Sequence, residues 1–234
     1  AGVTAYRVKD PDPNAVDNGN LLGVRIDVSV EAKFVDTYHV LFNRPNTRFR
    51  TMLKIHRHTI PPCIPLRQLA NRYLPQLRKD SSPEVEQDLI RFGKLLRKEL
   101  VSWHLRSAAV ESLRREAGVL DPKVRKGAET QGPSYGKVLN AFMSDEENEG
   151  DDSGVEERIT GRQDGPAKII EVESDLAVRQ ISLVWSNGQT AVAQIAKDGE
   201  IVRGAVRTRD GERLPQLERL LSGRMDGLVK RLNS

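Results

Sequence analysis

Two histidines, His56 and His58, have the spacing that most directly suggests metal chemistry. Alternate side chains of a strand point to the same face, so both imidazoles would lie on one side of such a strand. Two imidazoles can begin a zinc site, but a structural zinc site needs four ligands in tetrahedral geometry. The spacing does not indicate which of His39, Asp36 or Cys63 would complete the set. We therefore predict no metal site and expect the two histidines to contribute to a basic surface.

Cys63 is the single cysteine and the candidate nucleophile. One cysteine excludes an intramolecular disulfide and a multi-cysteine zinc site, and it fits a reducing compartment. The sequence contains no Gly-rich phosphate loop, no Ser-His-Asp grouping and no pair of carboxylates that suggests a pocket. We expect Cys63 to be a buried, inert thiol, and we predict no cofactor and no enzymatic activity. Rapid labelling of Cys63 in the folded state would revive the enzymatic alternative.

Positive charge is the third chemical feature, and it is unevenly distributed. The segment Ser144–Glu157 holds eight acidic residues and no Lys or Arg, which leaves 37 basic residues against 25 acidic ones elsewhere. A basic surface could contact phosphate groups. The basic clusters are Arg78–Lys79, Arg91–Lys94–Arg97–Lys98, Arg114–Arg115, Lys123–Arg125–Lys126 and Lys230–Arg231. Aromatic residues make up only 5% of the chain and no base-reading motif is present, so a solvated helix face is the simpler interpretation.

The stretch Leu53–Leu74 must position the histidines and the cysteine, and its pattern predicts a strand, an extended elbow and a helix. Pro61 and Pro62 lack a backbone N–H, and each holds the preceding residue out of the helical region. Pro65 suits the first turn of a helix, and the apolar residues after it recur at helical spacing. We expect Pro61, Pro62 and Pro65 to form a rigid structural elbow.

The strands expected before this elbow form an antiparallel meander. Residues 1–20 are rich in turn formers and predict a flexible tail. Alternating apolar residues predict strands over Leu21–Val30, Thr37–Asn43 and Arg48–Thr59.

A long amphipathic helix is expected after the elbow. Ser82 is the predicted N-cap, Pro83 follows at the first helical position, and Gly118 is the predicted C-cap. The apolar stripe comprises Val85, Leu89, Phe92, Leu96, Leu100, Trp103, Val110 and Leu113. Because more than thirty residues is long for a globular helix, we expect a break near Ser102 or Ser107. Packing of the stripe on the chain's own sheet is the preferred interpretation, and a coiled coil is the alternative.

Residues 119–166 are expected to form a linker with an acidic insertion, and residues 167–234 a second, small unit. Asn187-Gly188 and Asp198-Gly199 predict tight hairpin turns. Two-residue loops would place Trp185, Thr190 and Arg207 in one row of a half-polar face, and Ile181, Gln194 and Arg203 in another. The opposite face is small and apolar, with Val184, Ala191 and Val206 in one row, and it suits a closely packed helix. That helix is expected over 215–232, weakened by Gly223 and Gly227.

Two family resemblances rest on these residues. Pro61-Pro62-Cys63-Ile64-Pro65 resembles the P-x-x-x-P elbow of RWD domains, with Ile60 where that family usually has Tyr. The longer run HRHTIPPCIPLRQLA, the strand LLGVRIDV and the long helix resemble the CENP-O family of centromere components. The resemblance covers residues 21–118 well and 166–234 more loosely.

This resemblance implies an α+β fold of two RWD-like domains, each an antiparallel β-meander packed by helices. A long helix and the acidic linker would join them. The implied boundaries are a tail over 1–20, a first domain over 21–118, a linker over 119–166 and a second domain over 167–234. RWD domains resemble ubiquitin-conjugating enzymes, but the His-Pro-Asn triplet of those enzymes is missing here.

The resemblance also implies a function. The protein would be a non-enzymatic subunit of the inner kinetochore, within the constitutive centromere-associated network of the nucleus. It would form a heterodimer with a CENP-P-like tandem-RWD subunit and dock CENP-Q/CENP-U-like subunits for chromosome segregation, without membrane contact. We expect the following partner-contact residues: Leu100, Trp103, Trp185, Arg203, Arg207, Leu217, Leu220 and Leu221. The alternative is a basic domain that contacts centromeric DNA, weakly and in a salt-dependent manner.

Overall fold

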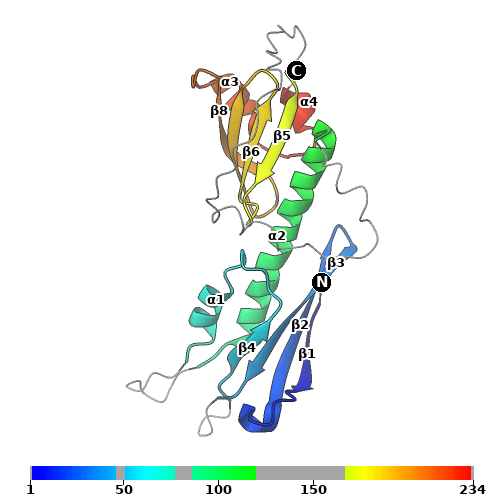
Figure 1. The fold of residues 1–234 in the computed structure, drawn as a ribbon, viewed down its shortest axis with the longest axis vertical. Coiled ribbons are helices and arrows are strands. Elements are labelled where there is room, and N and C mark those ends of the chain that lie inside the picture. The colour runs from blue at the N-terminus through cyan, green and yellow to red at the C-terminus, as the bar shows by residue number, and fades with distance from the viewer. Residues whose placement is uncertain (1, 46–50, 77–85, 120–166, 233–234) are drawn as a thin grey trace, which may run out of the picture.

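The computed structural model describes residues 2–45, 51–76, 86–119 and 167–232, and its architecture is mixed α/β. Two four-stranded antiparallel sheets have the strand orders β1-β2-β3-β4 and β5-β6-β7-β8. The strands are β1 (Gly2–Lys9), β2 (Asn20–Val30), β3 (Lys33–Asn43), β4 (Lys54–His58), β5 (Ile169–Ser174), β6 (Gln180–Trp185), β7 (Thr190–Ile195) and β8 (Ile201–Arg207). The helices are α1 (Leu66–Tyr73), α2 (Leu89–Ala117), α3 (Pro215–Leu221) and α4 (Leu228–Leu232), with a 3₁₀ turn, η1, at Val16–Gly19. Figure 1 shows the sheets at opposite ends of an elongated molecule, with α2 running along both.

The first sheet contains the predicted meander and one strand that was not predicted. Residues 1–20 were expected to be a tail, and this was wrong: β1 pairs with β2 along its whole length. The Tyr6 ring covers Gly23, where an added Cβ would collide with the ring. The Tyr6 hydroxyl lies 2.8 Å from Nδ1 of His39. Most β1 side chains are exposed at the sheet edge, so no alternating apolar pattern marked this strand.

The proline elbow leads from β4 into α1 as predicted. Ile60 and Ile64 are buried on either side of the prolines, in the same core as the inner faces of β2 and β3. The helix begins at Leu66, directly after Pro65.

Helix α2 starts later than predicted and runs without a break. Ser82 lies outside the described residues, and the structure places the N-cap at Asp88, whose carboxylate accepts a hydrogen bond of 2.7 Å from the backbone N–H of Arg91. Gly118 is the C-cap, with φ of 74°, which confirms that prediction. The expected break near Ser102 or Ser107 was wrong, because the helix is continuous over its 29 residues.

The apolar stripe of α2 belongs to two cores rather than one. Phe92, Leu96 and Leu100 are buried against the first sheet and α1. Val110 and Leu113 are buried in the core of the second sheet with α3 and α4. The stripe therefore packs on the chain's own sheets, as the preferred interpretation held, but the helix is shared between both halves of the molecule (Figure 1).

Hydrogen bonds and ion pairs fasten the second half of the molecule to α2. The Trp103 indole N–H donates to the carbonyl of Leu176 at 3.1 Å. The buried Arg106 guanidinium donates to the carbonyl of Ala177 at 3.0 Å, and burial lowers the pKa of Arg106. Arg114 donates to the carbonyl of Val172, on the outermost strand β5, at 3.1 Å. These bonds occupy carbonyl groups of β5 and its loop, so the helix covers this edge of the sheet.

The predicted register between β7 and β8 is confirmed from Thr190 to Gln194 but not at Ile195, which was expected opposite Val202 and pairs with Ile201. The register between β6 and β7 is shifted by one residue. Ala191 pairs with Val206 as predicted, but its β6 partner is Leu183 rather than Val184. The cause is the turn, in which the N–H of Trp185 donates to the carbonyl of Gln189, so three residues rather than two form the loop. A shift of one residue moves every side chain of the strand to the other face.

The small apolar face does receive a close helix, as predicted. An added Cβ at Gly204 would lie 2.9 Å from a methyl group of Leu221 on α3. The expected helix over 215–232 is instead two short helices, α3 and α4. In the segment between α3 and α4, Gly223 has a φ of 102° and Gly227 a φ of 73°. The two glycines therefore interrupt the predicted helix rather than only weakening it.

Candidate protein-binding surface

The two histidines that suggested a metal site are separated by an irregularity in the ladder between β3 and β4. His58 pairs with Val40 and Ile55 with Phe42, which leaves His56 in the bulge. Nε2 of His56 lies 3.2 Å from the carboxylate of Asp10. Within the described residues, no group of three His, Cys, Asp or Glu side chains could hold a metal ion.

Cys63 lies in the elbow and is partly buried. Burial raises the pKa of the thiol, with weaker opposing effects from its backbone hydrogen bond and from Arg106 and Arg179. A raised pKa keeps the sulfur protonated at neutral pH, and the protonated thiol is the unreactive form.

Three of the eight predicted partner-contact residues are buried inside the chain. Leu100 and Leu221 have no exposed surface, and Trp185 is 3% exposed. Leu100 packs in the core of the first sheet, and Trp185 and Leu221 pack in that of the second. The prediction is wrong for these three, because they have no surface to offer a partner. The register shift explains Trp185, since it turned the indole from the outer to the inner face.

The other five predicted residues retain exposed surface. Trp103 and Leu217 are partly buried, and Leu220 is 37% exposed on α3. Arg203 and Arg207 are exposed on β8, where Nε of Arg203 donates to the side-chain oxygen of Gln194 at 2.8 Å.

Arg203 and Arg207 border a sheet face that no helix of the described residues covers. We call it the outer face, defined by Glu171, Glu173, Gln180, Ser182, Val184, Thr190, Val192, Gln194, Arg203, Ala205 and Arg207. Its central row contains Ser182, Val192 and Ala205, and Val192 is 45% exposed. Helices α3 and α4 and the end of α2 pack on the opposite face. Small and β-branched side chains make the middle of the outer face flat enough for another sheet.

Charge on the outer face changes sign from one edge to the other. Glu171 and Glu173 lie on the outermost strand β5, and both are exposed. Arg203 and Arg207 lie on the opposite outermost strand, β8. Sequence reasoning identified the arginines but not the glutamates, because it predicted no strand over Ile169–Ser174, which forms β5.

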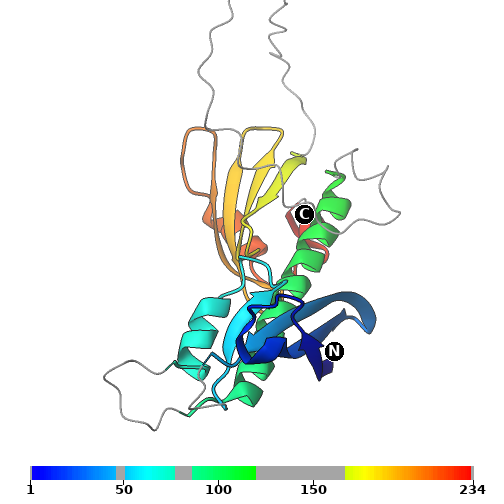
Figure 2. The ribbon, with the colours of Figure 1, turned by 60° about the horizontal axis from the view of Figure 1, so that its bottom comes forward.

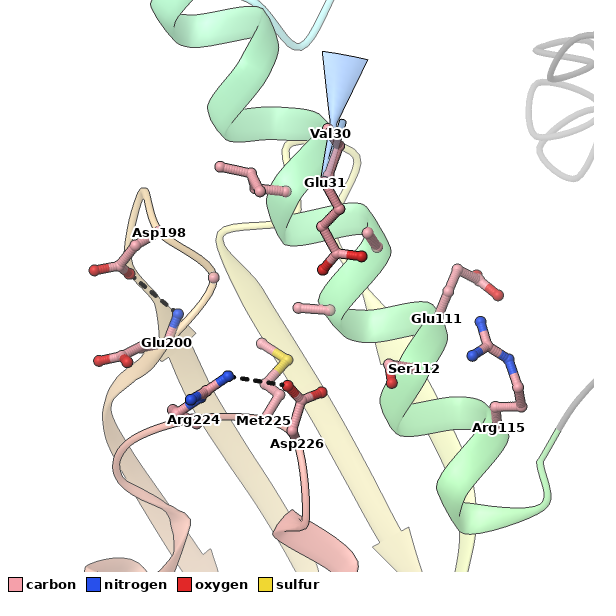
Figure 3. Close-up of a pocket in the computed structure, with 14 residues that line it drawn as sticks. Val30, Glu31, Glu111, Ser112, Arg115, Asp198, Glu200, Arg224, Met225 and Asp226 are labelled. Atoms are coloured by element: carbon pink, nitrogen blue, oxygen red, sulfur yellow. Dashed lines mark hydrogen bonds and ion pairs between the residues drawn. The ribbon is translucent and has the colours of Figure 1, made fainter. Parts of the chain in front are cut away.

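A separate polar cleft lies where the two halves of the molecule meet (Figure 3). Its volume is about 420 Å³, and it is bounded by the β2–β3 turn, α2 and the loops before β8 and α4. Its acidic lining residues are Glu31, Glu111, Asp198, Glu200 and Asp226, and its basic ones are Arg115 and Arg224. Arg224 lies 3.5 Å from Asp226, and the carboxylate of Asp198 accepts from the N–H of Glu200, so part of this charge is paired internally.

Comparison with known proteins identifies a family for this chain. Within the described residues, no helix is long and apolar enough to cross a membrane. A search of curated proteins finds no match. The family model described as "Cenp-O kinetochore centromere component" matches residues 3–232, nearly the whole chain. The chain therefore belongs to the CENP-O family of kinetochore centromere components, and its location is the kinetochore at the centromere, in the nucleus.

Proposed function

We propose that this CENP-O family member is a non-enzymatic structural subunit of the inner kinetochore, built from two RWD-like domains. It forms a heterodimer with a CENP-P-like tandem-RWD subunit, and the pair docks CENP-Q/CENP-U-like subunits for chromosome segregation. Within this proposal, the first domain comprises the first sheet and α1, the second comprises the second sheet with α3 and α4, and α2 belongs to both.

The observation that carries the pairing is the outer face of the second sheet. A face with exposed Val192 at its centre and small neighbours offers apolar area to a flat partner. Its polar and charged border resembles the polar rim that surrounds the centre of many interfaces.

The change of charge across the outer face restricts how a partner sheet can lie on it. If two such sheets face each other across a two-fold axis parallel to the strands, β5 of each lies over β8 of the other. Glu171 and Glu173 would then approach arginines equivalent to Arg203 and Arg207. A partner with the same architecture and the same charge order therefore fits this face, and such charge complementarity contributes to specificity and to the association rate. Leu217 and Leu220 lie on the other side of this sheet, so any partner contact that they make belongs to a different surface.

The experiment measures mass by light scattering after size exclusion, for the chain alone and after co-expression with the CENP-P-like subunit. We expect a defined one-to-one heterodimer. Val192→Glu should weaken this complex at least tenfold, because it places a charge at the apolar centre of the contact. Val35→Glu is the matched control, since Val35 is 44% exposed but lies on the first sheet. A monomeric chain that ignores the partner would overturn the pairing, and equal affinity of the two variants would exclude the outer face.

A further inference from the structure

Helix α1 packs beside the first half of α2 (Figure 2). Five exposed cations belong to these two segments. We call them the basic ridge: Arg72 of α1, and Arg91, Lys94, Arg97 and Lys98 of α2. Arg91, Lys94 and Lys98 are spaced by three and four residues, so they share one side of the helix. Phe92 and Leu96 point the opposite way, into the first core. The ridge is therefore a continuous positive surface rather than a set of scattered charges.

Lys94, Arg97 and Lys98 have no acidic residue three or four positions away in α2, and Asp88, three residues before Arg91, caps the helix through the Arg91 backbone N–H. Three of the four positions that adjoin Lys94 on the helix surface hold cations, and the fourth holds Ile90. Like charges at these spacings destabilise a helix by a few tenths of a kcal/mol per pair. Arg91 also lies in the first turn of α2, at the positive end of the helix dipole, which the N-cap carboxylate of Asp88 partly offsets. An anion bound here would relieve the repulsion among the cations of the ridge.

Elsewhere, α2 does pair its charges. Glu99 lies 2.7 Å from Lys197, and Glu111 lies 2.7 Å from Arg114. Within the described residues, no side chain of the ridge forms an ion pair with a carboxylate. A solvated face in which Arg and Lys alternate with Glu therefore describes α2 from Glu99 onward but not the segment Arg91–Lys98.

One aromatic ring holds two of these arginines in place. The guanidinium carbons of Arg72 and Arg91 each lie 5.5 Å from the centroid of the Tyr73 ring. Stacking on a ring face limits the motion of a guanidinium and leaves its edge N–H groups available to acceptors. This contact also joins α1 to α2, so the ridge crosses two helices that share one core.

We propose that the basic ridge binds the phosphate backbone of double-stranded DNA without reading its sequence. Arg91 and Lys98 are seven residues apart, about 10 Å along the helix axis. A row of cations of that length can contact several consecutive phosphates, which are spaced by about 3.4 Å of helix axis along each strand. The side chains of the ridge are long and charged, which suits phosphate contacts rather than base edges. The ridge lies in the first half of the molecule and the outer face in the second, so DNA and the proposed protein partner can bind together.

The test measures fluorescence anisotropy of two labelled duplexes of unrelated sequence, with the full-length chain, at several salt concentrations. With about four phosphate contacts, we expect affinity to fall roughly a hundredfold between about 50 and 200 mM salt, equally for both sequences. The variant Arg91→Gln, Lys94→Gln, Lys98→Gln should reduce the slope of log affinity against log salt by nearly three, because each lost phosphate contact contributes about 0.9.

The matched control removes three exposed charges from the first sheet instead, as Lys33→Gln, Lys54→Gln, Arg57→Gln. It should bind almost as wild type does. Equal slopes for the two triple variants, or no binding at the lowest salt, would overturn the proposal. A polyglutamate peptide that competes as strongly as unlabelled DNA would also overturn it, since the ligand would then be an acidic protein segment. Val192→Glu should keep full DNA affinity, which separates failure of this proposal from failure of the proposed heterodimer.

Discussion

His104 is a partly buried imidazole between the first sheet and α2. Its Nε2 lies 2.8 Å from the hydroxyl of Tyr38, and the Trp103 ring centroid is 4.7 Å away. Burial lowers the pKa of His104, and the negative charge of Asp36 opposes this shift with a smaller effect. The folded state therefore favours the neutral imidazole more than the unfolded chain does.

This lowered pKa predicts a pH-dependent stability with a definite sign. Below the ordinary histidine pKa of about 6.5, the unfolded chain binds a proton at His104 that the folded chain resists, so stability falls as the pH falls. The slope from this group is at most about 1.4 kcal/mol per pH unit between pH 7 and 5. Urea unfolding at several pH values should show a shallower slope for His104→Gln. His58→Gln, at an exposed position on β4, is the matched control. Identical slopes for all three proteins would refute the assignment to His104.

Single residues also show where sequence reasoning reached its limit. Trp185 was placed on the outer face because Asn187-Gly188 suggested a two-residue loop. A loop of three residues between β6 and β7 is compatible with the same strands and the same turn signal. It exchanges the buried and exposed side chains of β6. The indole is large and apolar enough to favour the core, and that preference was the cue available to choose the longer loop.

At the scale of elements, α2 belongs to two cores. Two similar substitutions in this helix should therefore destabilise different halves of the molecule. Leu96→Ala should destabilise the first half of the molecule and Leu113→Ala the second, each by about 2–5 kcal/mol, because both side chains are fully buried. Hydrogen exchange measures this directly. Leu96→Ala should lower protection mainly in β2 and β3, and Leu113→Ala mainly in β6 and β7. The same loss pattern for both variants would contradict two separate cores.

Most elements near the elbow could be predicted because their signals are local. Proline removes a backbone donor and fixes φ, so the end of β4 and the start of α1 follow from Pro61, Pro62 and Pro65. The start of α2 could not be chosen from such signals, since Ser82 and Asp88 are both good N-caps. The continuity of α2 depends on two sheets that lie far apart in sequence, and no local pattern reports that.

At the scale of the whole molecule, the second half is incomplete without α2. Residues 167–234 lack Val110, Leu113 and the Arg106 contact with Ala177, so their sheet would expose the surface that the helix covers. Domains this small have little margin of stability. We predict that a fragment of residues 167–234 has no cooperative thermal transition by circular dichroism. Adding a peptide of residues 100–119 should restore one, whereas a peptide of residues 86–99 should not. A fragment that melts cooperatively alone would show that the boundary at 167 is a true domain boundary.

Because α2 belongs to both cores, it also determines where a hybrid of this chain and a relative should be joined. A hybrid joined after Gly118 would bring Val110 and Leu113 from one parent against strands from the other. A hybrid joined within α2, between Leu100 and Val110, would let each core inherit all its buried side chains from a single parent. The part of this molecule that can be exchanged intact is therefore a sheet together with half of α2, and the position at which to join two parents lies in the middle of α2.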